Sequence, residues 1–424
     1  MDTRQTRRLA GLLSARLPDA RLDHIHDPRN PRGRRWSLFT LLSGVLCGMA
    51  SGATSLADVE RLSSTLSPAI RKRLGIVRRI PDTTLRDVLC QLDPQQVTAA
   101  LHATVRAAHR RKSLRSDALP FAVVSLDGKS TAISSCDDLV AQRQTGDDPS
   151  ALTGVVRTIT STLVSNSAKP CIDVFPVPAC TNEMGAFTAA LEQLMTTYPA
   201  LDIRLVAYDA GAASLANASA VVERHLHYLF CLRATQPTLY EAARLWLGTR
   251  DDATCDFRDE RREGGCSVTR LIFIGQAQDG PDGWEHLRTI LRVKTITVRS
   301  NGCTTTDERY LMSSLASDRL SPRQWQTIIR LRWGVETCHQ ILDTALCEDD
   351  HPWITQDPQG MLVVAILRRI VFTLLAIYRA ITQRSDERRQ MPWKILLEEI
   401  WAVLITATPE ALLGIRHRPL VPSG

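Results

Sequence analysis

The stretch Phe121-Ala-Val-Val-Ser-Leu-Asp-Gly-Lys-Ser130 decides how this sequence folds. Residues 121–126 form a short run of apolar and small side chains with two adjacent valines, which is typical of a strand buried on both faces. Such strands occur in sheets that helices cover from both sides. Because Asp127 follows the run directly, the segment predicts an acidic side chain at the carboxyl end of a strand, where α/β sheets bind ligands.

The segments that follow predict the topology of this sheet. Further apolar or β-branched runs alternate with turn-forming residues and with segments of helical periodicity. We expect strands at 158–164, 171–177, 203–208 and 228–232, and helices at 182–198 and 214–225. Three successive strands followed by alternating helix and strand is the element order of ribonuclease H. The expected fold class is therefore α/β, a ribonuclease-H-like mixed sheet flanked by helices.

The regions outside this core predict an N-terminal helical domain and a β-rich insertion. Ser321, Pro322 and Gln324 form a capping box, which begins a helix that should run through Ile341 or beyond. We divide the chain into a helical, basic domain at 1–117, a core in two parts at 118–236 and 311–380, a β-rich insertion at 237–310 and a C-terminal helical tail at 381–424.

Hydropathy and cysteine usage indicate a cytoplasmic protein without a membrane span. Residues 36–57 carry no charge, but their large apolar side chains share one helical stripe, which favours a buried core helix. A second apolar segment at 361–380 is interrupted by Arg368 and Arg369. The 11 cysteines are an odd number without a C-x-x-C pair, as expected in a reducing compartment.

Three acidic residues on three separate elements form the candidate catalytic site. Asp127 and Asp209 each follow an expected strand, so both should lie at the carboxyl edge of the sheet. Glu336 lies on the helix that begins at Ser321 and shares a face with Arg332. In-line cleavage of a phosphodiester bond uses one metal ion to activate the attacking oxygen and another to stabilise the leaving oxygen. Carboxylates, water and phosphate are the ligands that Mg²⁺ prefers, so two Asp and one Glu meet this need.

Each of these residues also has a structural explanation. A single Asp after a strand is more often a turn residue or a helix cap, and a Glu four residues after an Arg is more often a surface ion pair. A phosphate-binding P-loop at Gly128-Lys129-Ser130 is excluded, because that motif requires Gly at the position of Val123. The combination of the three carboxylates with the element order favours the metal site.

Basic residues are concentrated in the first quarter of the chain. Residues 1–36 contain nine arginines against four aspartates, and further clusters lie at 71–79 and 106–115. Such clusters either bind nucleic-acid phosphates or form a solvated arginine-rich surface, and the sequence leaves both open. The candidate DNA contacts in this region are Arg32, Arg34, Arg35, Arg71, Lys72 and Arg73.

Six segments share their residues and their spacing with one known family. They are Pro81-Asp-Thr-Thr-Leu-Arg86, Val124-Ser-Leu-Asp-Gly-Lys-Ser130, Thr181-Asn-Glu-Met-Gly-Ala186, Tyr208-Asp-Ala210, Tyr228-Leu-Phe-Cys-Leu-Arg-Ala-Thr-Gln236 and Arg332-Trp-Gly-Val-Glu336, with Leu342-Asp343 and Glu348-Asp349 behind the last. Together they resemble the H-repeat-associated transposases, DDE transposases carried by bacterial insertion sequences. The resemblance covers about residues 20–380.

The resemblance implies an enzyme, its metal ligands and its partners. In such a transposase, the triad that binds metal would be Asp127, Asp209 and Glu336, and it would hold two Mg²⁺ or Mn²⁺ ions. Arg332 and Lys129 would contact DNA. The implied reaction is cleavage of DNA strands at the ends of an insertion sequence and their transfer to a target. The implied partners are double-stranded DNA and a second copy of the chain in a homodimer.

Several residues depart from the family pattern. Ala132 stands where the family has Arg, residues 211–214 lack its His and Gln, Arg332 replaces the His before Trp333, and Thr337 replaces an Asn. Two alternatives therefore stay open. Beside the active transposase, these are a decayed transposase that acts only as a DNA-binding protein and a magnesium-dependent nuclease without strand transfer.

Overall fold

The computed structural model describes residues 3–137, 139–144, 153–209, 211, 213–233, 236–277, 283–413 and 415. Within these ranges ten strands form one mixed sheet in the order β2-β3-β1-β5-β6-β10-β9-β8-β7, with β4 paired to β3. The strands are β1 (Ala122–Ile133), β2 (Ala141–Gln144), β3 (Thr153–Leu163), β4 (Cys171–Val177), β5 (Ile203–Tyr208), β6 (His227–Leu232), β7 (Phe257–Glu263), β8 (Cys266–Gln276), β9 (Thr289–Val298) and β10 (Thr304–Ser313).

The centre of the sheet has the expected ribonuclease-H-like order. β1 is antiparallel to β3 and parallel to β5, and β5 is parallel to β6. β4 pairs antiparallel with β3, so the neighbours run β4-β3-β1-β5-β6. This confirms the predicted fold class of a mixed sheet flanked by helices.

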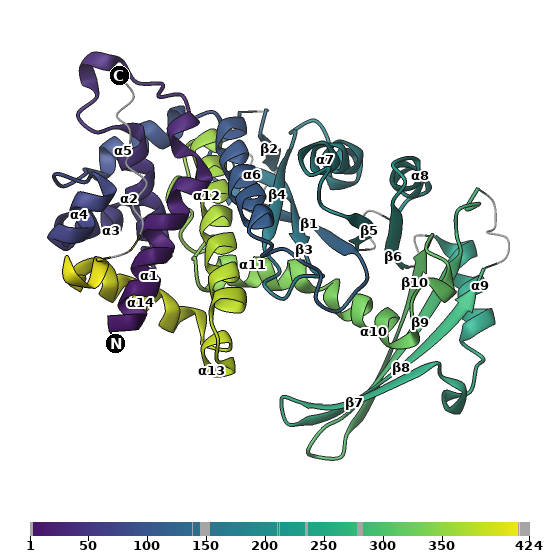
Figure 1. Cartoon of the computed structure of the whole chain (residues 1–424). Coiled ribbons are helices and arrows are strands. Elements are labelled where there is room, and N and C mark those ends of the chain that lie inside the picture. Colours follow the sequence, from purple (N-terminus) through teal and green to yellow (C-terminus); the bar gives the residue numbers. More distant parts are fainter. Residues whose placement is uncertain are drawn as a thin grey trace.

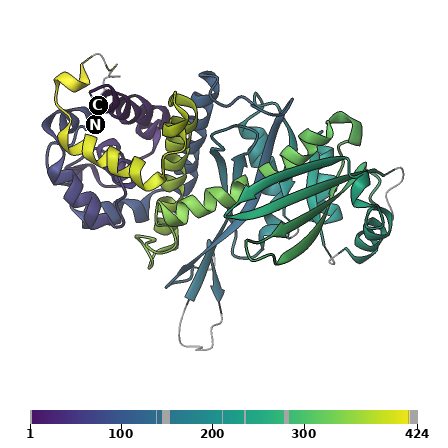
Figure 2. The same ribbon diagram turned by 90° about the horizontal axis from the view of Figure 1, so that it is seen from below.

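The strand β1 is longer than the sequence predicted, and Asp127 lies within it instead of directly after it. The prediction ended the strand at residue 126, but pairing with β3 continues from Val124↔Leu163 to Ile133↔Gly154. Pairing with β5 stops at Ser125↔Ala207. Beyond Ser125, β1 therefore continues as an arm paired only with β3, and in Figure 2 β2 and β3 project from the body of the molecule in this arm. Because the residues of this arm are mostly polar or small, a hydropathy pattern does not predict it as a strand.

Helices cover both faces of the central strands. One face packs on α7 (Glu183–Thr197) and the other on α10 (Pro322–Leu331). The alternation along β1 separates the two layers, because Val124 belongs to the core with Phe187 of α7 and Val123 to the core with Trp325 of α10. Odd-numbered residues of β1 thus face α10, and even-numbered ones face α7.

The capping box at Ser321 is present as predicted, but the helix that follows is interrupted. Ser321 accepts a bond from the Gln324 backbone and Gln324 returns one to the Ser321 backbone. The helix α10 ends at Leu331, and α11 (Gly334–Thr344) begins after a turn at Arg332 and Trp333. A Cβ at Gly334 would lie 2.8 Å from the Val164 side chain, so glycine at this position lets α11 approach the sheet closely. The prediction of one unbroken helix was wrong.

The strands β7 to β10 extend the same sheet beyond β6. β10 pairs with β6, and β9, β8 and β7 follow in antiparallel order. The helix α9 (Pro237–Leu247) lies beside β8 and β9 at this end of the molecule (Figure 1). The predicted insertion is thus continuous with the central sheet, while the division of the chain into domains stays a prediction.

The N-terminal part is helical and is completed by the end of the chain. Its helices are α1 (Thr3–Arg16), α2 (Leu38–Ala50), α3 (Leu56–Thr65), α4 (Pro68–Leu74), α5 (Asp82–Gln91) and α6 (Pro94–Arg110), with α8 (Leu215–Glu223) beside α7 in the core. The late elements α12 (Pro358–Ile377), a π-helical turn (Tyr378–Thr382), α13 (Asp386–Arg389) and α14 (Trp393–Thr406) return to it (Figure 1). α12 packs against α2, α5 and α6 and against β4, so it joins this part to the sheet.

The apolar helix α12 lies in the interior of the protein. Pro358–Thr382 is the segment of the described ranges that is long and apolar enough to cross a membrane, and 94% of its apolar window is buried inside the protein. Leu38–Ala50, the uncharged helix expected in the core, is also buried along most of its length. Both segments therefore contribute to the hydrophobic core of the helical part.

Candidate active site

The register of β1 and β5 brings Asp127 and Asp209 to the same level of the sheet. The last pair between the strands is Ser125↔Ala207, and each aspartate lies two residues beyond its member of that pair. Because side chains alternate along a strand, both aspartates point to the face of the sheet that α10 covers. The Asp209 carboxylate also accepts a hydrogen bond of 2.7 Å from the Gly211 backbone, which holds the turn after β5.

A hydrogen bond from β1 positions the helix that carries Glu336. The Ser125 hydroxyl donates to the Arg332 carbonyl at 2.8 Å and so fixes the turn between α10 and α11 against the strand. Glu336 lies in the first turn of α11, directly after this fixed point. One turn farther along, His339 Nδ1 lies 3.2 Å from the Asp127 carboxylate. The helix and the strand therefore meet at the acidic site.

The electrostatics show that the three carboxylates influence one another. Burial raises the pKa of Glu336, and although Arg332 opposes the shift, Asp127 and Asp209 raise this pKa further. Among the described residues, none of the three carboxylates forms an ion pair with a lysine or an arginine; the recorded partner is His339 on Asp127. The structure thus brings the predicted residues together and leaves their negative charge without a strong cationic partner.

A cavity of about 790 Å³ opens beside this site. Its lining includes Asp209 and Glu336, although not Asp127. Arginine and aromatic side chains form much of the remaining wall: Arg233, Arg309, Arg332, Tyr240, Tyr310 and Trp333. A cavity lined by both carboxylates and guanidinium groups is suited to a ligand that combines a metal ion with phosphate.

Arg332 lies four residues before Glu336 and lines the cavity beside the acidic site. It is 7% exposed, and its Nε has no hydrogen-bond partner among the described residues. The guanidinium group lies 5.5 Å from the centre of the Trp333 ring, and that of Arg309 lies 5.2 Å from the same ring. A buried donor without an acceptor is costly, so Arg332 is available for a phosphate oxygen in the cavity.

The donor set fits a divalent cation, although the described side chains do not enclose one. In the described ranges no three His, Cys, Asp or Glu side chains are arranged to hold an ion as they stand. The carboxylates of Asp127, Asp209 and Glu336 are nevertheless the oxygen ligands that Mg²⁺ and Mn²⁺ prefer. Open positions in such a site are normal, because Mg²⁺ keeps several waters and takes oxygens from the substrate phosphate.

Lys129, for which a DNA contact was predicted, is paired with carboxylates in the structure, and the DNA contact stays a prediction. Its ammonium group lies 2.6 Å from Asp343 and 3.0 Å from Asp349, and its side chain is 7% exposed. These carboxylates raise the pKa of Lys129 against the effect of burial. The amine is thus occupied by two carboxylates inside the protein and joins β1 to α11.

A second charge pair explains the Glu348-Asp349 motif. Glu348 lies 2.7 Å from Arg369 of α12, and the two side chains are 3% and 1% exposed. Burial alone would raise the pKa of Glu348, but Arg369, Arg368 and Lys129 lower it, so the carboxylate stays charged. This pair connects the segment behind α11 to α12 and has a structural role.

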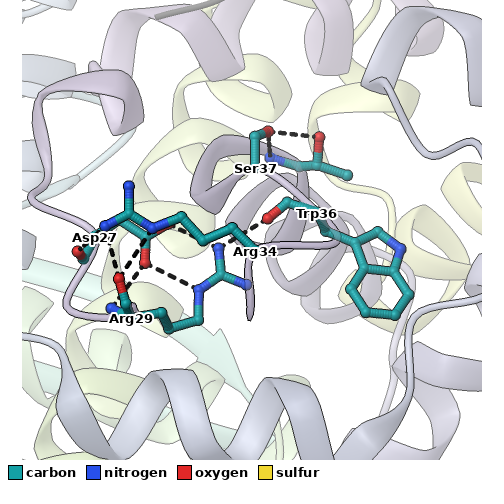
Figure 3. Close-up of polar contacts among 6 residues, drawn as sticks. Asp27, Arg29, Arg34, Trp36 and Ser37 are labelled. Carbon is teal, nitrogen blue, oxygen red and sulfur yellow. Dashed lines mark hydrogen bonds and ion pairs between the residues drawn. The ribbon is translucent and has the colours of Figure 1, made fainter. Parts of the chain in front are cut away.

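The predicted DNA contacts in the N-terminal part divide into two groups. Arg34, Arg71 and Arg73 donate to backbone carbonyls of other segments, at 2.6 Å to Arg29, 2.6 Å to Ser64 and 2.8 Å to Leu412. Figure 3 shows Arg34 in a cluster with Asp27 and Arg29. The second group consists of the exposed side chains Arg32, Arg35 and Lys72. The first group stabilises the fold, which a count of charges cannot reveal, and the second remains accessible to DNA.

The sequence analysis missed His339, which contacts Asp127. Its position three residues after Glu336 places it on the same face of α11, so helical spacing alone could have identified it. It also missed Glu183, although this residue lies in the quoted segment Thr181-Asn-Glu-Met-Gly-Ala186. Glu183 comes from the opposite face of the sheet, which a search for one strand edge and one helix does not consider.

Comparisons with known proteins identify the family of this chain. The family described as "Transposase DDE domain" matches residues 172–368, and the one described as "DDE_Tnp_1-associated" matches residues 20–104. The chain belongs to the DDE transposase family. The matched ranges include Asp209 and Glu336, while Asp127 lies between them.

Two further comparisons add little. No curated protein matches this chain. Among solved structures, the chain is similar to the piggyBac transposase of a synaptic complex with hairpin DNA, with 11% sequence identity, a TM-score of 0.44, and coverage of 99% of this chain and 86% of that one. A likeness this distant carries no conclusion about the present protein.

Proposed function

We propose that this transposase cuts DNA strands at the ends of an insertion sequence and joins them to target DNA in a reaction that depends on divalent metal. The observation that carries the proposal is that Asp127, Asp209 and Glu336 meet beside an arginine-lined cavity and that none of them has a lysine or arginine ion-pair partner in the described part of the chain. Unpaired carboxylates on packed elements are costly unless a cation completes them. The site therefore supports metal-dependent phosphodiester chemistry.

Asp127, Asp209 and Glu336 would hold two Mg²⁺ or Mn²⁺ ions, which supply an activated oxygen nucleophile and stabilise the leaving oxygen. Arg332 binds a phosphate oxygen of the substrate from the wall of the cavity. His339 holds the orientation of the Asp127 carboxylate through its Nδ1. The hydrogen bond from Ser125 to the Arg332 carbonyl keeps Glu336 at a constant distance from β1.

The proposed partner is double-stranded DNA, at both the transposon ends and the target. Exposed Arg32, Arg35 and Lys72 would contact its phosphates, together with Arg332 at the site. We further propose a homodimer, because two ends have to be held together for transfer, and a cytoplasmic location. All 11 cysteines are free in the structure, as expected in a reducing compartment.

The catalytic proposal is tested by Asp127→Asn, which keeps the shape of the side chain and weakens its binding of metal. We expect metal-dependent cleavage and strand joining on DNA with short inverted repeats to be lost, while DNA affinity changes less than about twofold, since phosphate contacts carry most of the affinity. The matched control is Asp202→Asn, an exposed aspartate just before β5. Undiminished cleavage by Asp127→Asn would place the chemistry elsewhere.

The same assay separates the alternative functions. Cleavage by the wild type without joining would indicate a nuclease, and binding without metal-dependent cleavage would indicate a decayed transposase. The residues that depart from the family pattern, such as Ala132 and Thr337, make both outcomes worth measuring.

The DNA-binding proposal is tested by replacing Arg32, Arg35 and Lys72 together by Ala. If each neutralises one phosphate, the slope of log affinity against log salt should become shallower by about 2 to 3 units, at about 0.9 per contact. The affinities for specific and for random DNA should fall together, because phosphate contacts carry no sequence information. An unchanged slope in the folded variant would move DNA binding to the arginines of the cavity.

A further inference from the structure

A fourth carboxylate approaches the acidic site from the other face of the sheet. Glu183 is the first residue of α7, and the helix begins where the Asn182 side chain accepts a hydrogen bond of 3.0 Å from the Gly185 backbone. The Glu183 carboxylate packs directly on the backbone of Gly128, the residue after Asp127. A Cβ at Gly128 would overlap the carboxyl carbon and both carboxyl oxygens of Glu183. Glycine at this position is what admits the fourth carboxylate.

The end of the pairing between β1 and β5 lets side chains from both faces reach the same place. Beyond Ser125, the pairing of β1 with β5 has ended, and among the described strands β1 continues to pair with β3. Asp127 points to the α10 side and Gly128 to the α7 side of this open edge. A carboxylate that covers Gly128 can therefore reach around the edge of β1 toward Asp127.

The charges around Glu183 belong to the acidic site. Burial raises the pKa of Glu183, and Asp127 raises it next; Arg157 opposes the shift, Asp209 adds to it and His339 opposes it. The side chain is partly buried, and among the described residues Glu183 has no ion-pair partner. Glu183 is therefore close enough to be influenced by two of the three predicted metal ligands.

A buried hydroxyl beside these carboxylates is a second, independent feature. Tyr208 precedes Asp209, is 2% exposed, and its hydroxyl has no hydrogen-bond partner among the described residues. Its ring meets Phe187 of α7 edge-on at 5.4 Å, so it lies on the same side of the sheet as Glu183. Burial raises the pKa of Tyr208, followed by Glu183, Asp127 and Asp209. A buried hydroxyl without a partner is costly, so the Tyr208 hydroxyl is free to donate a hydrogen bond to a neighbouring carboxylate.

We propose that Glu183 is a fourth carboxylate of the metal site, held there through the absence of a side chain at Gly128, with the Tyr208 hydroxyl available to hydrogen bond to it. The inference rests on the proposed function, since it adds a ligand to the site of Asp127, Asp209 and Glu336. Charge supports it, because four carboxylates balance two divalent cations, whereas three leave an excess of positive charge. Glu183 contributes from α7, an element on which none of the other three ligands lies.

The test measures Mn²⁺ binding to the full-length protein without DNA, by electron paramagnetic resonance of free Mn²⁺ and by calorimetry. Glu183→Gln keeps the shape of the side chain and should weaken Mn²⁺ binding by about tenfold or more, the usual effect of losing a group that supports a metal site. Gly128→Ala keeps every carboxylate but displaces that of Glu183, so it should weaken binding in the same direction. Asp82→Asn, at the start of α5, is the matched control and should bind Mn²⁺ as the wild type does.

The outcomes separate this inference from the proposed function. If Asp127→Asn abolishes Mn²⁺ binding while Glu183→Gln and Gly128→Ala bind as the wild type does, Glu183 is an ordinary first-turn residue and the inference is wrong. If neither Asp127→Asn nor Glu183→Gln changes binding, or if the wild type does not bind Mn²⁺, the metal site itself is wrong. Should Gly128→Ala fail to fold, Glu183→Gln with Glu183→Ala decides the question.

Discussion

Two groups of carboxylates lie close to β1 and α11 and differ in their partners. In the unpaired group, Asp127 of β1 and Glu336 of α11 lack a lysine or arginine partner among the described residues. In the paired group, Lys129, which lies two residues after Asp127 on β1, contacts Asp343 of α11 at 2.6 Å and Asp349 at 3.0 Å. The paired group fastens α11 to the strand. The unpaired group lies at the end of the β1–β5 pairing, where a ligand can enter. Pairing, more than burial, distinguishes the candidate catalytic carboxylates from the structural ones.

Glu348, which pairs with Arg369, is the most buried of the paired carboxylates, and its replacement should cause the largest loss of stability. Glu348→Gln leaves Arg369 charged and buried, so we expect the free energy of unfolding to fall by about 3 to 5 kcal/mol, as for other broken buried pairs. The measurement is urea denaturation at pH 7. Replacing both Glu348 and Arg369 by Leu should cost less than the single change. A loss below about 1 kcal/mol in the single variant would contradict the structural role of this pair.

Replacing Lys129 should cause an intermediate loss of stability. Lys129→Met removes the ammonium group but keeps much of the side-chain volume, and we expect a loss of about 1 to 2 kcal/mol, since Asp343 and Asp349 are partly exposed and water can screen them. Denaturation at low and high salt checks this. If the variant instead keeps its stability and loses DNA affinity, Lys129 contacts DNA after all and the two groups are less distinct.

The paired group should also be sensitive to acid. The pKa of Glu348 lies below its ordinary value of 4.5, so its contribution to stability is complete above that pH and is lost as the pH falls through the lower value in the folded protein. The stability advantage of the wild type over Glu348→Gln should therefore shrink as the pH is lowered below about 4.5. Denaturation at a series of pH values measures it, and an advantage that grew in acid would reverse the assigned direction.

Replacing a carboxylate of the unpaired group should change the stability least, and it should raise the stability instead of lowering it. Because the pKa of Glu336 is raised, its charge opposes folding above that pKa and has no effect once it is protonated. Glu336→Gln should raise the melting temperature of the metal-free protein at pH 7 by less than about 2 °C, since the side chain is exposed. The difference should disappear near pH 4, and added Mn²⁺ should stabilise the wild type more than the variant.

The sequence predicted the central strands, the place of Asp209 after β5 and the place of Glu336 on a helix, but it placed Asp127 after β1 instead of within it. Buried strands such as β5 and β6 are short apolar runs, and their order follows from the chain. The arm of β1 beyond Asp127 could not be predicted, because its polar residues are stabilised by pairing with β3, about thirty residues away. Only the folded structure shows that the pairing of β1 with β3 extends farther along β1 than its pairing with β5.

The remaining differences concern side chains whose partners are distant in sequence. Arg73 donates to carbonyls near the end of the chain, and Lys129 contacts residues more than 200 positions away. Charge clusters in a sequence do not distinguish such internal donors from free cations. The break before α11 had a local signal in Gly334, which the prediction of a continuous helix overlooked.

The last strand of the sheet, β7, affects how copies of this protein can meet. In the described part of the chain its strand partner is β8 alone, and six of its seven residues, from Arg258 to Glu263, are charged. A free strand edge can pair with a strand of another chain, but here an incoming strand would have to desolvate a dense row of charges of both signs. Edge-to-edge polymerisation through β7 is therefore disfavoured, which protects a long exposed sheet from aggregation at high concentration.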